Sequence, residues 1–156
     1  MRIDDIGGTE NGDSHHRYPH RPYAALLLRG TLGALFLTHA GLKLFVFTPA
    51  GTAQFFGSVG LPPALAYLTI AAEVFGGIAL ILGVWTRVAA IALIPILLGA
   101  IVAVHGAAGF FFDNAHGGWE FPAFWIVALI VQALLGDGAL ALRVTSVQAT
   151  RPALAH

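Results

Sequence analysis

The sequence predicts an all-α protein, a four-transmembrane-helix bundle, on three observations. Of its 156 residues, 57% are hydrophobic and only 10% are charged, whereas a soluble domain carries about 25% charged residues. Four long apolar runs follow one another, and about 20 helical residues suffice to cross the hydrocarbon core of a bilayer. None of the four runs has the polar face that a water-soluble bundle needs. We therefore expect one multi-pass domain surrounded by the lipid bilayer.

Residues 1–22 differ from the rest and are predicted to form a disordered polar N-terminal tail. They hold four acids, three arginines and three histidines. No apolar core follows the first basic residues, so this segment is not a secretory signal peptide. His15, His16 and His20 have metal-binding side chains, but the composition is more typical of a solvated tail, and we expect no metal site. Residues 143–156 are predicted to form a short C-terminal tail.

The expected membrane domain, 23–142, contains all four apolar runs, which cover residues 23–47, 63–84, 87–105 and 120–142. Each run is predicted to be helical, because every backbone polar group in lipid must find its partner within the segment. After the first run, Thr48 and Pro49 form a cap followed by a proline at the first helical position. They predict a short interfacial helix in the first outer loop.

Basic residues predict the orientation of the bundle. Arg17 and Arg21 precede the first run, Arg87 lies in the turn between the second and third runs, and Arg143 follows the fourth. The two long loops, between the first two runs and between the last two, contain no Lys or Arg. The positive-inside rule then places both termini in the cytoplasm and both long loops outside.

Glycines and a proline are expected to shape the packing of the helices. Small residues allow helices in a membrane to approach closely. Pro95 lies inside the third run and should kink that helix. The glycines expected to permit close approach are Gly30, Gly33, Gly76, Gly77 and Gly83.

Two charged residues, Arg29 and Glu73, fall inside the predicted crossings. Arg29 is about 9 Å and Glu73 about 16 Å from the cytoplasmic end of its helix, at a rise of about 1.5 Å per residue. A buried charge in lipid costs a few kcal/mol, so such residues are paired or functional. Because arginine can snorkel over several Å, we predict a buried ion pair between Arg29 and Glu73. That pair would serve either function or the register of the helices.

The outer half of the bundle collects a candidate polar site of His39, Lys43, His105 and Glu120. The first, third and fourth helices each bring a titratable group to a similar depth, and such convergence is typical of functional sites and of ion-pair networks. Simpler interpretations stay open. Lys43 and His105 would also fit as side chains that snorkel to the interface, and Glu120 as a residue at the positive end of its helix.

The sequence also excludes several classes of chemistry. The chain has no cysteine, which excludes disulfides, cysteine-ligated iron–sulfur clusters and a CxxC redox pair. It has no basic stripe of the kind that nucleic-acid binding requires, so no nucleic-acid partner is expected. It has no nucleotide-binding fingerprint either. Any electron chemistry would need a bound cofactor or a partner.

Four motifs in order resemble the DoxX family of bacterial membrane proteins. They are RGTLGALFLTHAGLK (29–43), GTAQFFGSVGLPP (51–63), AAEVFGGIALILGVWTR (71–87) and GGWEFP (117–122). The resemblance covers about residues 23–142 and implies a four-helix protein of the bacterial cell inner membrane. The positions that match the family pattern are Arg29, His39, Lys43, Glu73, Arg87 and Glu120; the match implies no catalytic role for any of them.

The resemblance implies a redox-associated subunit that binds a quinone or a lipid-like molecule. Related polypeptides are subunits of a thiosulfate:quinone oxidoreductase, so a membrane or soluble redox enzyme is the implied partner. A quinone needs an apolar slot and a few donors at its carbonyls. His39 or Lys43 are candidate donors, Glu73 is a candidate proton relay, and the slot would be lined by Phe36, Phe45 and Trp125.

Other functions stay open at this level. One is a non-catalytic membrane anchor or assembly partner for other enzymes. Another is a small-solute or proton pathway, since buried Arg, Glu and His residues are typical of relays. A haem between His39 and His105 would need both rings on opposite faces of one iron. Catalysis itself and assembly into a homo-oligomer are not decided by the sequence.

Overall fold

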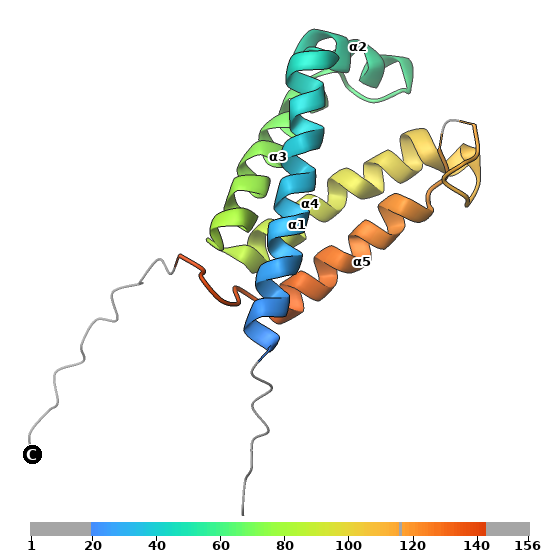
Figure 1. Ribbon diagram of the computed structural model, residues 1–156. Helices are drawn as coiled ribbons and strands as arrows, with labels where there is room; N and C mark the ends of the chain where they lie inside the picture. Colours follow the sequence, from blue (N-terminus) through green and yellow to red (C-terminus); the bar gives the residue numbers. More distant parts are fainter. Residues whose placement is uncertain (1–19, 116, 143–156) are drawn as a thin grey trace, which may run out of the picture.

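The chain folds into helices joined by short connections, as a computed structural model shows for residues 20–115 and 117–142 (Figure 1). The part of the chain that the structure describes has no strand, which confirms the all-α prediction. Most of the two predicted tails lies outside these residues. The elements are α1 (Arg21–Gly41), η1 (Leu42–Val46), α2 (Pro49–Ser58), α3 (Ala64–Leu82), α4 (Thr86–Ala100), η2 (Ile101–His105), η3 (Gly106–Ala108) and α5 (Glu120–Leu135).

Three helical stretches are long and apolar enough to cross a membrane. They are α1 with η1, α3, and α4 with η2 and η3. The helix α5 is apolar but has only 16 residues. It ends at Leu135, although we predicted that the fourth run would be helical to residue 142. The reason is a pair of glycines with positive φ, Gly136 (78°) and Gly138 (73°), which turn the backbone out of the helix.

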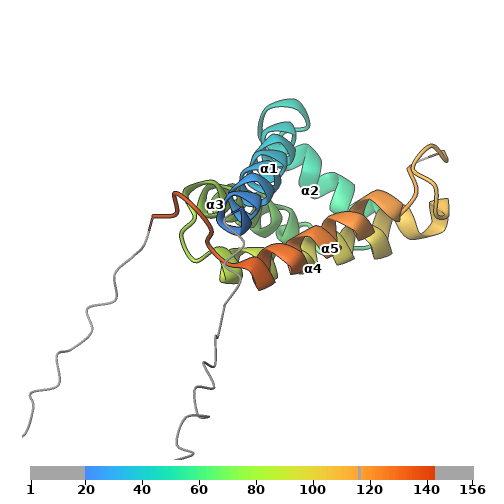
Figure 2. The same ribbon diagram turned by 60° about the horizontal axis from the view of Figure 1, so that its bottom comes forward.

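Two pairs of helices make up the molecule. The helices α1 and α3 lie side by side, as do α4 and α5, in both Figure 1 and Figure 2. The two pairs meet at the end where the described chain begins and finishes, which we call the terminal end. They diverge toward the opposite end, the loop end, which carries α2 and the connection between α4 and α5. A shared apolar core joins the pairs and includes Leu32, Phe36, Leu80, Leu93 and Leu129.

The helices α1 and α3 approach each other closely at two glycines. A Cβ atom added at Gly33 would lie 2.7 Å from the carbonyl oxygen of Gly77, and one added at Gly77 would lie 3.0 Å from that of Gly33. Contact between backbones therefore leaves no room for a side chain at either position, as predicted for small residues between membrane helices. The same prediction was wrong for Gly30, which has no neighbouring atom within 4 Å of its added Cβ.

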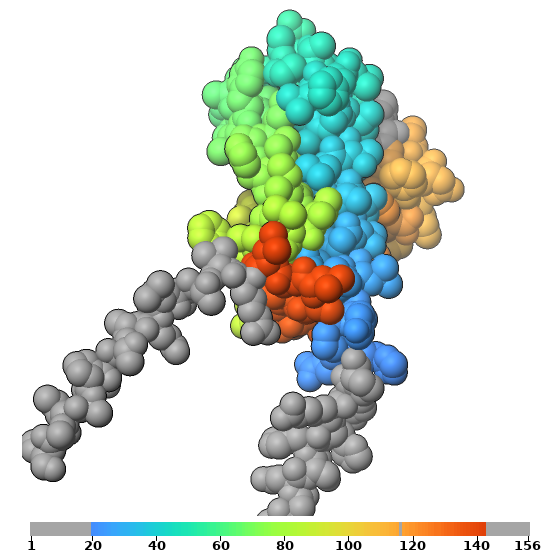
Figure 3. Space-filling model, turned by 60° about the vertical axis from the view of Figure 1, so that its left-hand side comes forward, coloured from blue at the N-terminus to red at the C-terminus, as the bar shows by residue number. Residues whose placement is uncertain are grey.

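Residues 136–142 return from α5 to the terminal ends of α1 and α3. The backbone N–H of Ala139 donates to the carbonyl of Pro22 at 2.9 Å, and that of Leu142 donates to Leu82 at 3.0 Å. Figure 3 shows this segment, in red, packed against α1 in blue and α3 in green. These bonds tie the two ends of the described chain together.

The short helix α2 confirms the helix predicted in the first loop. Thr48 precedes it and accepts a hydrogen bond from the Gly51 N–H at its Oγ1 (3.2 Å), while Pro49 takes the first helical position. Thr48 itself has φ 60° and ψ 154°, a conformation that non-glycine residues rarely adopt. Phe55 in this helix is 48% exposed. Placement of α2 at a membrane interface stays a prediction.

Candidate functional site

The ion pair predicted between Arg29 and Glu73 is wrong. Arg29 is fully buried, and its guanidinium donates to three backbone carbonyls: Leu80 (2.9 Å) and Ile81 at the end of α3, and Ala139 (2.8 Å). Glu73 instead accepts from Lys43. The physical reason is that the last turn of a helix leaves carbonyls without partners and carries partial negative charge. The last turn of α3 therefore supplies acceptors for the guanidinium of Arg29.

Glu73 and Lys43 form the buried ion pair of the described residues. The Lys43 ammonium lies 2.8 Å and 2.9 Å from the two carboxylate oxygens. The side chain of Glu73 is only 4% exposed and that of Lys43 is 18% exposed. Glu73 is the tenth of the 19 residues of α3, so the pair lies at the middle of a membrane-length helix.

The helix direction explains why Lys43 reaches Glu73. Side chains on an α-helix tilt toward its N-terminus, so the long stem of Lys43 runs from the loop end back toward the middle of the bundle. Lys43 also lies in η1, a π-helical turn at the end of α1. Such turns are uncommon and often occur at functional sites.

His39 lies one turn before Lys43 and contacts an aromatic pair. Its ring meets the indole of Trp125 edge-on, with centroids 5.1 Å apart, and Trp125 stacks on Phe36 at 4.8 Å. Phe36 is 1% exposed and Trp125 is 5% exposed, whereas His39 is half-buried. The helices α1, α3 and α5 thus bring a histidine, an ion pair and a buried indole together.

The indole N–H of Trp125 is buried and has no hydrogen-bond partner among the described residues. A buried tryptophan usually finds a partner for this group, because an unsatisfied donor loses its bond to water without replacement. We predicted Trp125 only as part of an apolar lining and did not predict this donor. A tryptophan in an otherwise apolar run was the available signal, since its ring carries one polar atom.

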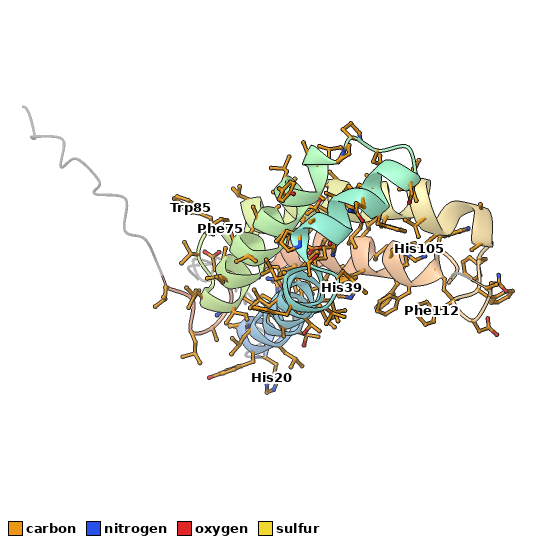
Figure 4. All side chains as sticks on the ribbon, turned by 90° about the horizontal axis from the view of Figure 1, so that it is seen from above. His20, His39, Phe75, Trp85, His105 and Phe112 are labelled. Carbon is orange, nitrogen blue, oxygen red and sulfur yellow. The ribbon has the colours of Figure 1, made fainter. Side chains whose placement is uncertain are left out.

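His105 and Glu120 are separate from this group and hold the loop between α4 and α5. The Nδ1 of His105 donates to the Gly117 carbonyl at 2.8 Å, and a carboxylate oxygen of Glu120 accepts from the backbone N–H of Phe112 at 2.8 Å. Figure 4 shows His105 and Phe112 at the same side of the molecule, with His39 nearer its middle. Of the four residues of the predicted site, the structure thus groups His39 with Lys43 and gives the other two loop contacts.

Comparison with known proteins identifies a family and two relatives. The model of the family described as DoxX matches residues 24–106. A Bacillus subtilis protein named "Putative oxidoreductase CatD" is 39% identical over 117 residues, which cover 75% of this chain and 82% of that protein. A Haemophilus influenzae protein named "Uncharacterized protein" is 34% identical over 125 residues, or 79% of this chain and 90% of its own length. No solved structure matches.

The chain belongs to the DoxX family. The matched range holds Arg29, His39, Lys43 and Glu73, so it contains the buried ion pair and the histidine beside it. Trp125 and the loop held by Glu120 lie outside the matched range.

Proposed function

We propose that this protein is a redox-associated membrane subunit that binds a quinone or a lipid-like molecule beside its buried ion pair. The observation that carries the proposal is the group formed by His39, the Lys43–Glu73 pair and Trp125. These side chains combine apolar rings with a few polar atoms, the usual make-up of a site for a small organic ligand. Titratable groups buried at mid-membrane are functional candidates by default.

Each residue has a proposed part in holding the ligand. Phe36 and Trp125 supply flat apolar walls, and His39 supplies a hydrogen-bond donor at the edge of the same group. The carboxylate of Glu73 is the proposed proton relay for a ligand that gains or loses protons. Lys43 holds that carboxylate in place through its two hydrogen bonds. The oxidoreductase name of the Bacillus subtilis relative supports a redox role.

We propose four membrane crossings with both termini in the cytoplasm of a bacterial cell and the loop end outside its inner membrane. The contacts of residues 136–142 with Pro22 and Leu82 support an even number of crossings, since they bring the ends of the described chain together. The 16 residues of α5 span about 24 Å. That is short of the roughly 30 Å hydrocarbon core. Residues 136–142, whose backbone bonds to Pro22 and Leu82, would complete the crossing.

Ligand extraction tests the proposed function. The full chain is purified from a bacterial host in a mild detergent, and bound lipids, quinones and proteins are identified and quantified by mass spectrometry. A quinone or one specific lipid at about one per chain is expected. His39→Phe keeps a ring at that position and removes its polar atoms, so it should lower the ligand content. Thr31→Val, at an exposed position on the same helix, is the control and should leave the content unchanged.

The same experiment separates the remaining functions. A co-purified soluble enzyme without any small ligand would favour the membrane anchor or assembly partner instead. Absence of both, together with proton flux in liposomes that Glu73→Gln abolishes, would favour a proton pathway. Either result would overturn the ligand-binding proposal.

A further inference from the structure

A row of aromatic rings leads from the loop end into the buried group. Phe112 contacts Phe121 (centroids 5.6 Å apart), Phe121 contacts Trp125 (5.7 Å), and Trp125 stacks on Phe36 (4.8 Å). Exposure falls along the row, from 58% at Phe112 through 44% at Phe121 to 5% at Trp125. We call these four residues the aromatic row. Ring centroids 4.5–7 Å apart are the spacing at which aromatic groups attract one another.

The ring of His39 contacts Trp125, and Lys43 follows His39 by one helical turn. The polar groups of this region differ in whether they already have a hydrogen-bond partner. Lys43 and Glu73 bond to each other through both carboxylate oxygens. The Nε1–H of Trp125 has no partner among the residues that the structure describes, although Trp125 is only 5% exposed. The indole is a donor only. A ligand that satisfies it must therefore present an acceptor.

We propose that Trp125 donates a hydrogen bond from Nε1 to a carbonyl oxygen of a planar ring ligand that packs along the aromatic row. This inference rests on the proposed function and narrows its ligand to the carbonyl-bearing ring class, of which quinones are the membrane-soluble representatives. Trp125 is then a binding and specificity-determining residue. The row supplies apolar contact to the ring, and the indole N–H selects for the carbonyl.

An acyl chain fits these observations less well than a ring. Hydrocarbon tails have no acceptor atom to satisfy the indole, so an acyl chain at this position would leave the donor buried and unpaired. Flat rings also match the stacked and tilted arrangement of the row, whose interplanar angles are 29°, 51° and 53°. An acceptor atom carried on a flat ring therefore fits both the unpaired donor and the aromatic rings around it, and a ring carbonyl is such an acceptor.

A pair of matched probes isolates the carbonyl. Binding of 2,3-dimethyl-1,4-naphthoquinone and of 2,3-dimethylnaphthalene, which has similar rings and no carbonyl, is measured by titration of the full chain in lipid nanodiscs. Trp125→Phe keeps an aromatic ring and removes the N–H. Because one neutral hydrogen bond is lost, the Kd for the quinone should rise about threefold to tenfold, and the Kd for the hydrocarbon should change less than twofold.

Trp119→Phe is the matched control. Trp119 packs edge-on against Phe110 in the loop, with centroids 4.8 Å apart, and lies outside the aromatic row. The same chemical change there should leave both Kd values unaltered. Equal weakening of the two probes by Trp125→Phe would mean that the indole offers only apolar surface, and no weakening of either would mean that it does not touch the ligand. Both results overturn the inference and leave quinone binding intact.

A wild-type chain that binds neither probe would instead refute the proposed ring-ligand function itself, so the two failures are distinguishable. An NMR measurement covers the case in which Trp125→Phe does not fold. In the double variant W85F/W119F, Trp125 is the single tryptophan, and its indole N–H resonance should move downfield on addition of the quinone. The hydrocarbon should leave that resonance in place; an equal shift with both probes contradicts the proposed bond.

Discussion

Replacing Lys43 by methionine should destabilise the protein more than replacing Lys43 and Glu73 together. The ammonium lies 2.8 and 2.9 Å from the two carboxylate oxygens, and Glu73 is 4% exposed, so Lys43→Met leaves a buried carboxylate without a counter-charge. Removing one partner of a buried pair costs about 3–5 kcal/mol. Glu73→Gln should also destabilise the protein, because the half-buried ammonium is then left without its carboxylate.

The double variant Lys43→Met with Glu73→Gln removes both charges at once. Uncharged replacements of a buried pair are often close to neutral, so its unfolding free energy should fall within about 1–2 kcal/mol of wild type. The measurement is reversible unfolding by SDS titration in mixed micelles, followed by circular dichroism. Arg87→Met is the control, because Arg87 is exposed and its change should be small.

Additive losses in this cycle would refute the reasoning, because two residues that interact must show a coupling energy. A second readout is the chemical reactivity of the Lys43 amine, because Lys43 is the single lysine of the sequence. An amine-reactive reagent should modify Lys43 slowly in wild type and faster in Glu73→Gln. Equal rates would show that the carboxylate does not shield the amine.

Three further predictions concern the framework around the site. Arg29→Met should lower the unfolding free energy, because the carbonyls of Leu80 and Ala139 lose their donor; hydrogen exchange should rise at residues 136–142, and protection there equal to wild type would contradict the contact. Gly33→Leu should abolish folding in detergent, because its Cβ would already lie 2.7 Å from a backbone oxygen of α3, whereas Gly30→Leu, at an open position, should fold normally and serves as the control. Glu120→Ala should speed hydrogen exchange at the Phe112 amide without lowering ligand binding; a loss of binding would place Glu120 in the site.

The helices were largely predictable because their signals are local. Long apolar runs marked the three membrane-length helices, and the Thr48–Pro49 pair marked the start of α2. The end of α5 was missed because Gly136 and Gly138 stand in a run that remains apolar beyond them. Hydropathy does not register a positive φ, so an apolar count extends the helix past the residue where its backbone turns.

The partner of Arg29 could not be predicted from the charges alone. An arginine and a glutamate at mid-membrane suggested an ion pair, yet the carbonyls at the end of α3 lie nearer to the guanidinium. Backbone acceptors appear in a sequence only as helix ends, whose positions relative to another helix depend on packing. For Lys43 a usable signal existed, because its side chain must tilt toward the N-terminus of α1 and so toward the middle of the bundle.

The candidate site was predictable in its residue types and less so in its grouping. His39 and Lys43 share a helix face by their spacing. In the structure, His39 contacts Trp125 and Lys43 pairs with Glu73. His105 and Glu120 were expected at the same depth, but each binds backbone of the connecting loop. Polar residues at helix ends have backbone groups within reach, and a sequence does not show which of them a folded loop presents.

Photolabelling tests most directly whether a ring ligand binds beside the Lys43–Glu73 pair. An azido derivative of a naphthoquinone is added to the full chain in nanodiscs, irradiated, and the modified peptides are identified by mass spectrometry. Labelling should concentrate on residues 36–43 of α1 and η1 and on residues 121–125 of α5, and it should disappear in the presence of excess unlabelled quinone. Labelling spread over exposed apolar positions such as Leu27 and Phe75, and insensitive to competitor, would contradict the proposed site.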